Sequence, residues 1–309
     1  MKPELIAELL AKAGTLMEAL PWIKRTYGGT VVIKYGGAAM TDPLLRDSVA
    51  ADIVLMKLVG INPVIVHGGG PEITNYMQRL GMPIEFYQGL RVTDAAAMEI
   101  VKMVLVGKVN KELVSAINQH GRLAVGIAGD DGNLIKAKQL DERLGRVGEI
   151  TCIDTTVVEN LIEDGFIPVI ATVAAGDDGG SYNINADLVA GEIASALGAE
   201  KVIFLTDVDG LYADFADKES LISALSLGEA ERMVADDALS TGMIPKVGAC
   251  IHALRAGVPR AHILNGITPH ALLLEVYTDA GVGTMITHTG SLGLPDDDMY
   301  IAYEDEVTL

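Results

Sequence analysis

Apolar runs of strand length alternate with segments of helical periodicity along most of the chain. Residues 30–37 form a β-branched run that ends in glycines, and apolar residues recur at helical spacing between 43 and 60. Further strand-like runs, with helical segments between them, lie at 63–70, 122–129, 166–171, 201–210 and 260–265. Strands covered on both faces are almost continuously apolar. The alternation therefore predicts an α/β fold, a three-layer αβα sandwich with a mainly parallel open sheet.

One further helix is predicted ahead of the first strand. Apolar residues at positions 5, 6, 9, 10, 13, 16, 17 and 20 follow helical spacing, and Pro21 is expected to mark the end of the segment. An amphipathic helix here packs either on the chain's own core or against another subunit. The pattern alone favours neither.

Charge and cysteine content narrow the class of protein. The 309 residues contain 23 Lys and Arg against 42 Asp and Glu, so the net charge is −19. Such an acidic chain repels nucleic acid and anionic membranes, and we expect neither as a partner. Cys152 and Cys250 form no CxxC motif, and charged residues interrupt the first twenty positions. These features favour a reducing, cytoplasmic location.

Two strand-like runs end in glycines, "KYGG" at 34–37 and "HGGG" at 67–70. In a parallel sheet both would emerge at the carboxyl edge, where such sheets bind ligands, and free backbone N–H groups there form an anion cradle. Lys34 lies inside an apolar run. It is either a lysine extending from a strand end to solvent or a cation directed at a phosphoryl group. The chain has no GxxxxGK[ST] motif and no GxGxxG after the first strand, which argues against P-loop and dinucleotide-binding proteins.

Six stretches, taken together in order and spacing, resemble the amino-acid kinase family. They are VVIKYGGAAM, PVIVHGGGPEI, GLRVTD, YNINAD, FLTDVDGLY and TGMIPKV. The resemblance extends from about Thr30 to Thr287 and is greatest to those members that act on N-acetyl-L-glutamate in arginine biosynthesis. It implies transfer of the γ-phosphoryl group of ATP to the side-chain carboxylate, without a covalent enzyme intermediate. It also implies Mg²⁺ held mainly by the nucleotide phosphates, so we name no protein metal ligand.

The resemblance assigns catalytic roles to three residues. Lys34 and Lys246 would flank the transferring phosphoryl group, and Asp187 would hold both lysines in place. Phosphoryl transfer needs positioning and positive charge, and two ammonium groups supply these. Taken alone, Lys246 would be a solvated lysine at a helix end, and Asp187 a carboxylate favoured by a helix N-terminus.

For the acyl substrate, the resemblance points to Gly69, Gly70, Arg91 and Asn183. The glycines would offer backbone N–H groups, and Arg91 would pair with the α-carboxylate, which a planar guanidinium suits. Asn183 would contact the substrate, whereas Asn185 is expected to cap the following helix.

The nucleotide would be bound by Gly36 and Gly37 on its phosphate side. Thr206, Asp207 and Tyr212 of "TDVDGLY" would line the pocket for adenine and ribose, again by resemblance.

Members of the family that are inhibited by arginine share two further features with this chain. One is the N-terminal helix, which in that branch joins dimers into hexamers. The other is a C-terminal region in which Lys218, Glu275 and Gly281 would contact arginine. The implied division is an oligomerisation helix at 1–26, a kinase domain at 27–287 and an acidic tail at 288–309. Within the kinase domain, about 27–180 would bind the acyl substrate and about 181–287 the nucleotide.

Some positions depart from the family pattern, and two other functions stay open. Thr241 replaces the glycine common in the family, in the loop before Lys246, and Trp22, Asn265 and Ile267 differ from the residues usual in the regulatory region of the arginine-inhibited branch. A sister kinase of carbamate, aspartate, glutamate or UMP would share the sheet and the lysines. A non-catalytic arginine sensor would bind arginine without turning over ATP.

Overall fold

The central feature of the computed structural model is an eight-stranded sheet with the order β14-β16-β15-β11-β1-β2-β8-β5. The structure describes residues 3–40, 42–214, 217–236, 239, 243–278 and 281–290. Neighbouring strands of this sheet are parallel except for the antiparallel pair β15 and β16. The strands are β1 (Thr30–Tyr35), β2 (Asn62–His67), β5 (Ala124–Ala128), β8 (Ile167–Ala171), β11 (Lys201–Thr206), β14 (Ala224–Ser226), β15 (Arg260–Asn265) and β16 (Thr284–Thr287).

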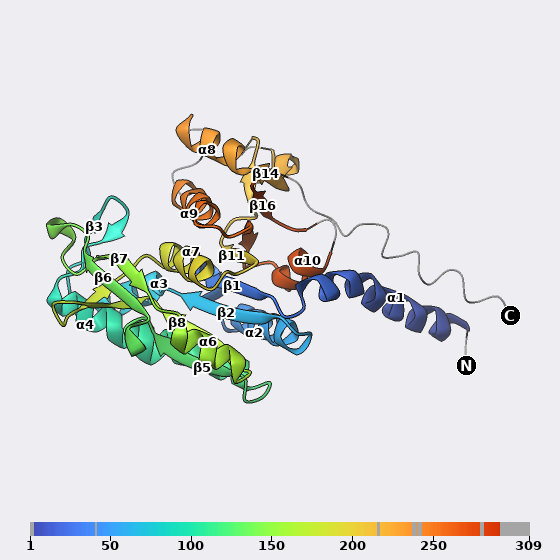
Figure 1. The fold of residues 1–309 in the computed structure, drawn as a ribbon, viewed down its shortest axis with the longest axis horizontal. Helices are drawn as coiled ribbons and strands as arrows, with labels where there is room; N and C mark the ends of the chain where they lie inside the picture. The colour runs from blue at the N-terminus through green and yellow to red at the C-terminus, as the bar shows by residue number, and fades with distance from the viewer. Residues whose placement is uncertain are drawn as a thin grey trace.

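Helices cover both faces of this sheet (Figure 1). They are α2 (Pro43–Leu58), α3 (Gly70–Arg79), α4 (Ala95–Lys102), α5 (Asn110–Asn118), α6 (Thr156–Glu163), α7 (Ala186–Ala196), α8 (Leu227–Ala235), α9 (Ile244–Arg255) and α10 (Ala271–Tyr277). Alternate residues of β1 face opposite sides: Ile33 packs in the cluster that contains α2 and α5, and Val32 packs in the cluster that contains α7 and α9. The predicted three-layer arrangement is confirmed.

A four-stranded sheet, β10-β9-β6-β7, and two short hairpins complete the fold. Its strands are β6 (Ile135–Gln139), β7 (Gly148–Ile153), β9 (Val173–Gly176) and β10 (Ser181–Asn183), and the hairpins are β3 (Phe86–Tyr87) with β4 (Leu90–Arg91) and β12 (Leu211–Tyr212) with β13 (Leu221–Ile222). Short 3₁₀ segments lie at Gly37–Met40, Asp131–Asn133, Glu142–Leu144 and Lys218–Ser220. A π-helical segment, Met103–Val109, joins α4 to α5.

The N-terminal helix α1 (Pro3–Thr26) extends away from the body of the protein. The C-terminal end of α1 contacts α10 (Figure 1). Pro21 lies inside the helix, so its expected role as the end of the helix is wrong. The helix continues to Thr26, whose hydroxyl donates to Trp22 O at 2.9 Å. Several apolar side chains of α1 are exposed, among them Leu10 (65%) and Leu16 (73%).

Two features discussed from the sequence fall outside the described residues. Thr241 and most of the acidic tail, from residue 291 onward, belong to the segments for which the structure gives no description. Throughout the described ranges, every helix is too short or too polar to cross a bilayer.

Candidate active site

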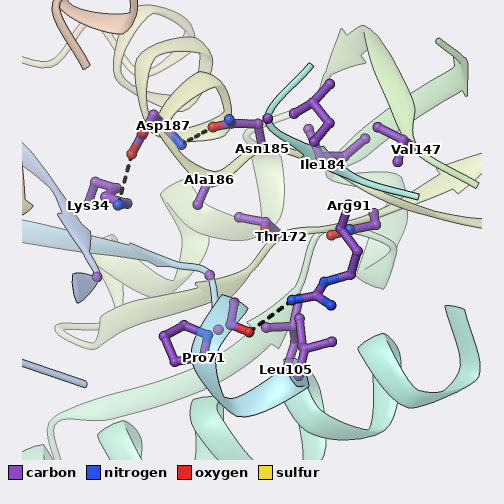
Figure 2. Close-up of a pocket in the computed structure, with 18 of the residues that line it drawn as sticks. Lys34, Pro71, Arg91, Leu105, Val147, Thr172, Ile184, Asn185, Ala186 and Asp187 are labelled. Carbon is purple, nitrogen blue, oxygen red and sulfur yellow. Dashed lines mark hydrogen bonds and ion pairs between the residues drawn. The ribbon is translucent and has the colours of Figure 1, made fainter. Parts of the chain in front are cut away.

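A cavity of about 310 Å³ opens at the carboxyl ends of β1 and β2 (Figure 2). Tyr35 and His67 are register partners in these strands, so the two glycine-rich turns that follow them are neighbours. The cavity is lined by residues from both turns, from the β3–β4 hairpin and from the start of α7. The sequence-predicted residues among them are Lys34, Gly36, Gly37, Gly69, Gly70, Arg91, Asn183 and Asp187.

Lys34 and Asp187 form an ion pair at one end of the cavity. Lys34 Nζ lies 2.9 Å from Asp187 Oδ1, and the two side chains are 14% and 17% exposed. Asp187 lies in the first turn of α7, where the side chain of Asn185 accepts a hydrogen bond from its backbone N–H at 2.8 Å. The predicted capping role of Asn185 is confirmed. The pair fixes one ammonium group at the cavity wall.

Arg91 is buried at the opposite side of the cavity. One of its terminal nitrogens donates to Gly70 O at 3.1 Å and to Thr74 Oγ1 at 2.6 Å, and its guanidinium carbon lies 4.9 Å from the ring centroid of Phe86. It is 7% exposed, and burial lowers its pKa. Across the described part of the chain, no carboxylate lies within ion-pair distance of Arg91. A buried guanidinium paired only with neutral acceptors is a receptor for an anionic ligand group.

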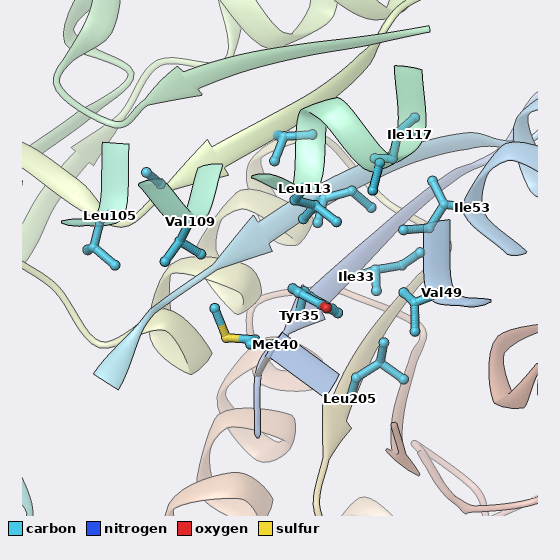
Figure 3. Packing of buried hydrophobic residues seen from close by; sticks show 14 of the residues in the cluster. Ile33, Tyr35, Met40, Val49, Ile53, Leu105, Val109, Leu113, Ile117 and Leu205 are labelled. Atoms are coloured by element: carbon cyan, nitrogen blue, oxygen red, sulfur yellow. The ribbon is translucent and has the colours of Figure 1, made fainter. Parts of the chain in front are cut away.

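The "HGGG" turn leads directly into α3, whose N-terminus faces the cavity. The N-cap, Gly69, has an extended φ of 179°, so a side chain is excluded here by space and not by backbone strain. A Cβ on Gly69 would lie 2.6 Å from Leu105 Cδ2, whereas a Cβ on Gly70 would meet nothing within 4 Å. Leu105 belongs to the buried cluster on the α2 side of the sheet (Figure 3).

The remaining predicted substrate residue, Asn183, lies at the end of β10. Its side-chain amide donates to Thr93 Oγ1 at 3.4 Å, and its backbone N–H donates to Arg146 O at 2.8 Å. Asn183 therefore approaches the cavity from the four-stranded sheet, opposite the glycine turn.

Lys246 is not among the residues that line this cavity. It is half-buried in the first turn of α9, and α9 packs against α7, the helix of Asp187. Cys250, one turn further along α9, lies close enough to Asp187 for the negative charge to contribute, after burial, to raising the pKa of the thiol. The structure thus joins Lys34 and Asp187 directly and places Lys246 on the neighbouring helix.

The predicted nucleotide residues lie in two places, at the turn after β1 with the end of β11, and in the β12–β13 hairpin. A Cβ on Gly37, which has a φ of +69°, would lie 3.4 Å from Thr206 C, so this turn abuts the end of β11. Thr206 is buried, and its hydroxyl donates to Val208 O at 3.0 Å; Asp207 is exposed. Tyr212 lies in the β12–β13 hairpin.

Asp209, just before β12, accepts hydrogen bonds from the hairpin and from the end of β15. Tyr212 donates to Asp209 Oδ2 at 2.6 Å, and Asn265 donates to Asp209 Oδ1 at 2.7 Å. Lys218 Nζ lies 4.5 Å from the centroid of the Tyr212 ring, which places it beside a predicted nucleotide residue.

Glu275 and Gly281 lie together on the side of α10. One oxygen of Glu275 lies 2.7 Å from His262 Nδ1, and the other accepts from the backbone N–H groups of Val282 and Gly283 at 2.8 and 3.2 Å. Both side chains are almost fully buried, and His262 Nε2 has no hydrogen-bond partner in the described residues.

Sequence reasoning missed several residues of the cavity. Thr74 and Phe86 hold Arg91, while Leu105 and Thr172 line the wall. Thr74 follows Gly70 by one helical turn, and this spacing is the one signal that could have indicated it. The others come from segments distant in the sequence.

ATP fits the charges at the site, with one ammonium group and two glycine turns at the same edge of the sheet. The described residues contain no cluster of three His, Cys, Asp or Glu side chains arranged to hold a metal ion.

Comparison with known proteins was made for both sequence and structure. The family model described as "Amino acid kinase family" matches residues 29–265. The chain is 55% identical over 272 residues to the acetylglutamate kinase of Thermosynechococcus vestitus, covering 88% of this chain and 92% of that protein. It is 52% identical over 288 residues to the acetylglutamate kinase of Moorella thermoacetica, with coverages of 90% and 97%.

Among solved structures, N-acetylglutamate synthase from Neisseria gonorrhoeae, complexed with coenzyme A and N-acetyl-glutamate, is similar with a TM-score of 0.80 and 26% identity. The similarity covers 89% of this chain and 63% of the synthase chain. The carbamate kinase of Giardia shares the fold, with a TM-score of 0.65, 18% identity and coverages of 84% and 99%. The match over most of the chain, and relatives more than half identical along it, show that the chain belongs to the amino acid kinase family.

Proposed function

We propose that this chain transfers the γ-phosphoryl group of ATP to the side-chain carboxylate of N-acetyl-L-glutamate. The observation that carries the proposal is the presence, in one cavity, of a buried guanidinium that has no carboxylate partner among the described residues and of an ammonium group held by Asp187. A substrate with two carboxylates uses both ends: one is bound and the other reacts. The similarity to acetylglutamate kinases supports the same substrate.

In this proposal, Arg91 binds the α-carboxylate and Asn183 contacts the acylated amino acid. The N–H groups of Gly69 and Gly70, at the N-terminus of α3, face the reacting carboxylate and the transferring phosphoryl group. Lys34 stabilises the negative charge that develops on the phosphoryl oxygens, and Asp187 holds Lys34 at that position. Lys246 would approach from α9 and supply the second ammonium group.

No general base is required, because the attacking carboxylate is ionised at neutral pH. The nucleotide would lie over Gly36 and Gly37, with its adenosine part toward β11 and the β12–β13 hairpin. When bound, Mg²⁺ would offset the charge of the nucleotide phosphates that coordinate it.

The experiment is an acyl-phosphate assay, in which hydroxylamine traps the product, run with ATP and a panel of acceptors; ADP release is measured in parallel, because the product from UMP is not an acyl phosphate. We expect product with N-acetyl-L-glutamate and little with glutamate, aspartate, carbamate or UMP. Preferred turnover of another acceptor would replace this proposal with the sister-kinase alternative. ATP-independent arginine binding without turnover would favour the sensor alternative.

We also propose that L-arginine inhibits the reaction by binding near Glu275 and Gly281. His262 Nε2 has no partner among the described residues, and a cationic ligand reaching this region would have to replace one of the hydrogen bonds that Glu275 now accepts. The α1–α10 contact adjoins this region, because Glu275 lies in α10. Arginine should lower turnover in the wild type, and Glu275→Gln should raise the concentration needed for half-inhibition without abolishing basal turnover.

The exposed apolar side chains of α1 support a homo-oligomer formed through this helix, as the family resemblance implies. Deleting residues 1–26 should reduce the mass measured by light scattering, since the chain would lose the apolar contact surface. An unchanged mass would refute the role of α1 in assembly.

A further inference from the structure

The histidine that ends β2 adjoins the glycine turn of the cavity and is completely buried. His67 Nδ1 lies 2.9 Å from Gly68 O, and His67 Nε2 lies 3.1 Å from Asn110 Nδ2. A carbonyl oxygen accepts and an amide nitrogen donates. The ring therefore carries its proton on Nδ1 and accepts at Nε2. Burial lowers the pKa of His67 to about 4, in agreement with a neutral ring.

The orientation of Asn110 is fixed by the same rule. Its Nδ2 also lies 2.8 Å from Val169 O and 3.3 Å from Ile127 O, so the amide nitrogen and not the oxygen must face these carbonyls. Asn110 is fully buried, and a Cβ on Gly126 would overlap its oxygen. The two hydrogens of this amide nitrogen serve Val169 O, Ile127 O and His67 Nε2, so one hydrogen is shared, and the group can present only a donor to His67.

The π-helical segment brings Asn110 to this position. Asn110 N–H bonds to Leu105 O, five residues earlier. In an α-helix, residues five apart lie roughly 140° apart around the axis, whereas a π turn stacks them on one side. Leu105 therefore packs on Gly69 while Asn110 reaches His67, and the two contacts support the same glycine turn from below (Figure 3 shows the position of Leu105).

Peptide geometry connects His67 to the cavity. A trans peptide unit is planar, and its C=O and N–H point in opposite directions. Because Gly68 C=O points toward His67 Nδ1, the N–H of Gly69 must point away from His67. Gly69 lines the cavity, and no acceptor for its N–H exists among the residues that the structure describes.

We propose that His67, held in one tautomer by Asn110, is a positioning residue that aims the Gly69 N–H at the reacting groups. The inference rests on the proposed phosphoryl transfer and names a residue that acts through the backbone. His67 exchanges no proton with substrate. Its contribution is the direction of one donor, which matters most when charge develops on the phosphoryl oxygens.

Two substitutions test the roles of the two ring nitrogens of His67 separately. Asn places an amide nitrogen two bonds from Cβ, where Nδ1 lies in histidine, and Gln places one three bonds from Cβ, where Nε2 lies. His67→Asn should keep the bond to Gly68 O and retain kcat within about threefold, whereas His67→Gln should lower kcat by about 10-fold or more with a smaller change in KM. Equal losses of kcat in the two variants, or no loss in His67→Gln, would overturn the proposal.

A second measurement does not depend on activity. In the full chain with ¹⁵N-labelled histidine, NMR should show His67 neutral and protonated on Nδ1 between pH 8 and 5. Asn110→Ala should change the His67 signals. Asn118→Ala, on the same helix, should not, because Asn118 bonds to Leu123 and Ala124 instead. A His67 ring protonated on Nε2 in the wild type would refute the inference. This result does not depend on whether the chain catalyses the proposed phosphoryl transfer.

Discussion

The cavity beside β2 and the β12–β13 hairpin beyond β11 hold their polar side chains in opposite ways. In the cavity, Arg91 is buried and bonds only to neutral acceptors among the described residues, and the Gly69 N–H of the glycine turn has no acceptor in that part of the chain. Next to the hairpin, Asp209 already accepts from Tyr212 of β12 and from Asn265 at the end of β15. The cavity is organised for a ligand before one arrives, whereas the polar groups beside the hairpin are already paired with protein groups. Substitutions should therefore affect function strongly in the first region and weakly in the second.

The largest effect is expected for Lys34→Ala. Removing the ammonium group takes away charge stabilisation of the phosphoryl oxygens and leaves Asp187 partly buried without its partner. We expect kcat to fall by about 10²- to 10³-fold, with a smaller change in KM for N-acetyl-L-glutamate. Steady-state kinetics with a thermal melt as the folding control would test this. A folded variant with near-normal kcat would remove Lys34 from the mechanism.

Arg91→Ala should act on binding more than on turnover. A hydrogen bond between charged groups contributes about 1.5–3 kcal/mol, so KM for the acyl substrate should rise by roughly 10- to 100-fold while KM for ATP stays nearly constant. Arg91→Lys keeps the charge but loses the planar fork. Its KM for the acyl substrate should lie between those of the wild type and Arg91→Ala. If KM for ATP rose as much as KM for the acyl substrate, the assigned contact would be wrong.

Gly69→Ala tests how closely the glycine turn must be packed. The new Cβ would meet Leu105 at 2.6 Å, so the turn or the leucine must move. We expect kcat/KM to fall by about 10-fold, since displacements of about 1 Å in a positioned site are costly. Gly69→Ala combined with Leu105→Ala relieves the contact. Recovery in the double variant would attribute the loss to packing, and persistent loss would attribute it to the approach of ligand.

The smallest effect is expected for Tyr212→Phe. The hydroxyl of Tyr212 is occupied by Asp209, while the ring stays beside Lys218. Both kcat and KM for ATP should stay within about threefold of the wild type, because a satisfied surface hydrogen bond contributes only about 0.5–1.5 kcal/mol. A large rise in KM for ATP would show that the hydroxyl leaves Asp209 for the nucleotide, and the contrast between the two regions would disappear.

The parts of the site that could be predicted from sequence are those in which a charged or flexible residue interrupts a regular pattern. Lys34 stands out in an apolar strand, and the triple glycine stands out before a helix. Thr172 and Phe86 could not be identified in this way. Thr172 follows an ordinary buried strand, and Phe86 is a 59% exposed residue of a two-residue strand whose importance depends on Arg91 lying over it.

The fold, too, could be predicted where the sequence pattern is regular and not where local backbone geometry decides. Strand periodicity predicted six of the eight strands of the central sheet, because burial on both faces leaves a strong apolar signal, and it missed the short strands β14 and β16. Pro21 was misjudged, since a helix that loses one backbone hydrogen bond still continues when the residues on either side are helix-compatible. The π-helical segment could not be predicted from the apolar spacing. Its extra residue per turn changes only which carbonyl accepts the hydrogen bond of each N–H.

That segment makes the fold of this chain sensitive to the number of residues between α4 and α5. A π turn differs from an α turn by a single inserted residue. A one-residue deletion anywhere in Met103–Val109 would restore a continuous α-helix and rotate everything before it by roughly 100° relative to α5. Aligning homologues by composition alone would hide such a change, whereas counting residues between the aspartate that caps α4, Asp94, and Asn110 would reveal it.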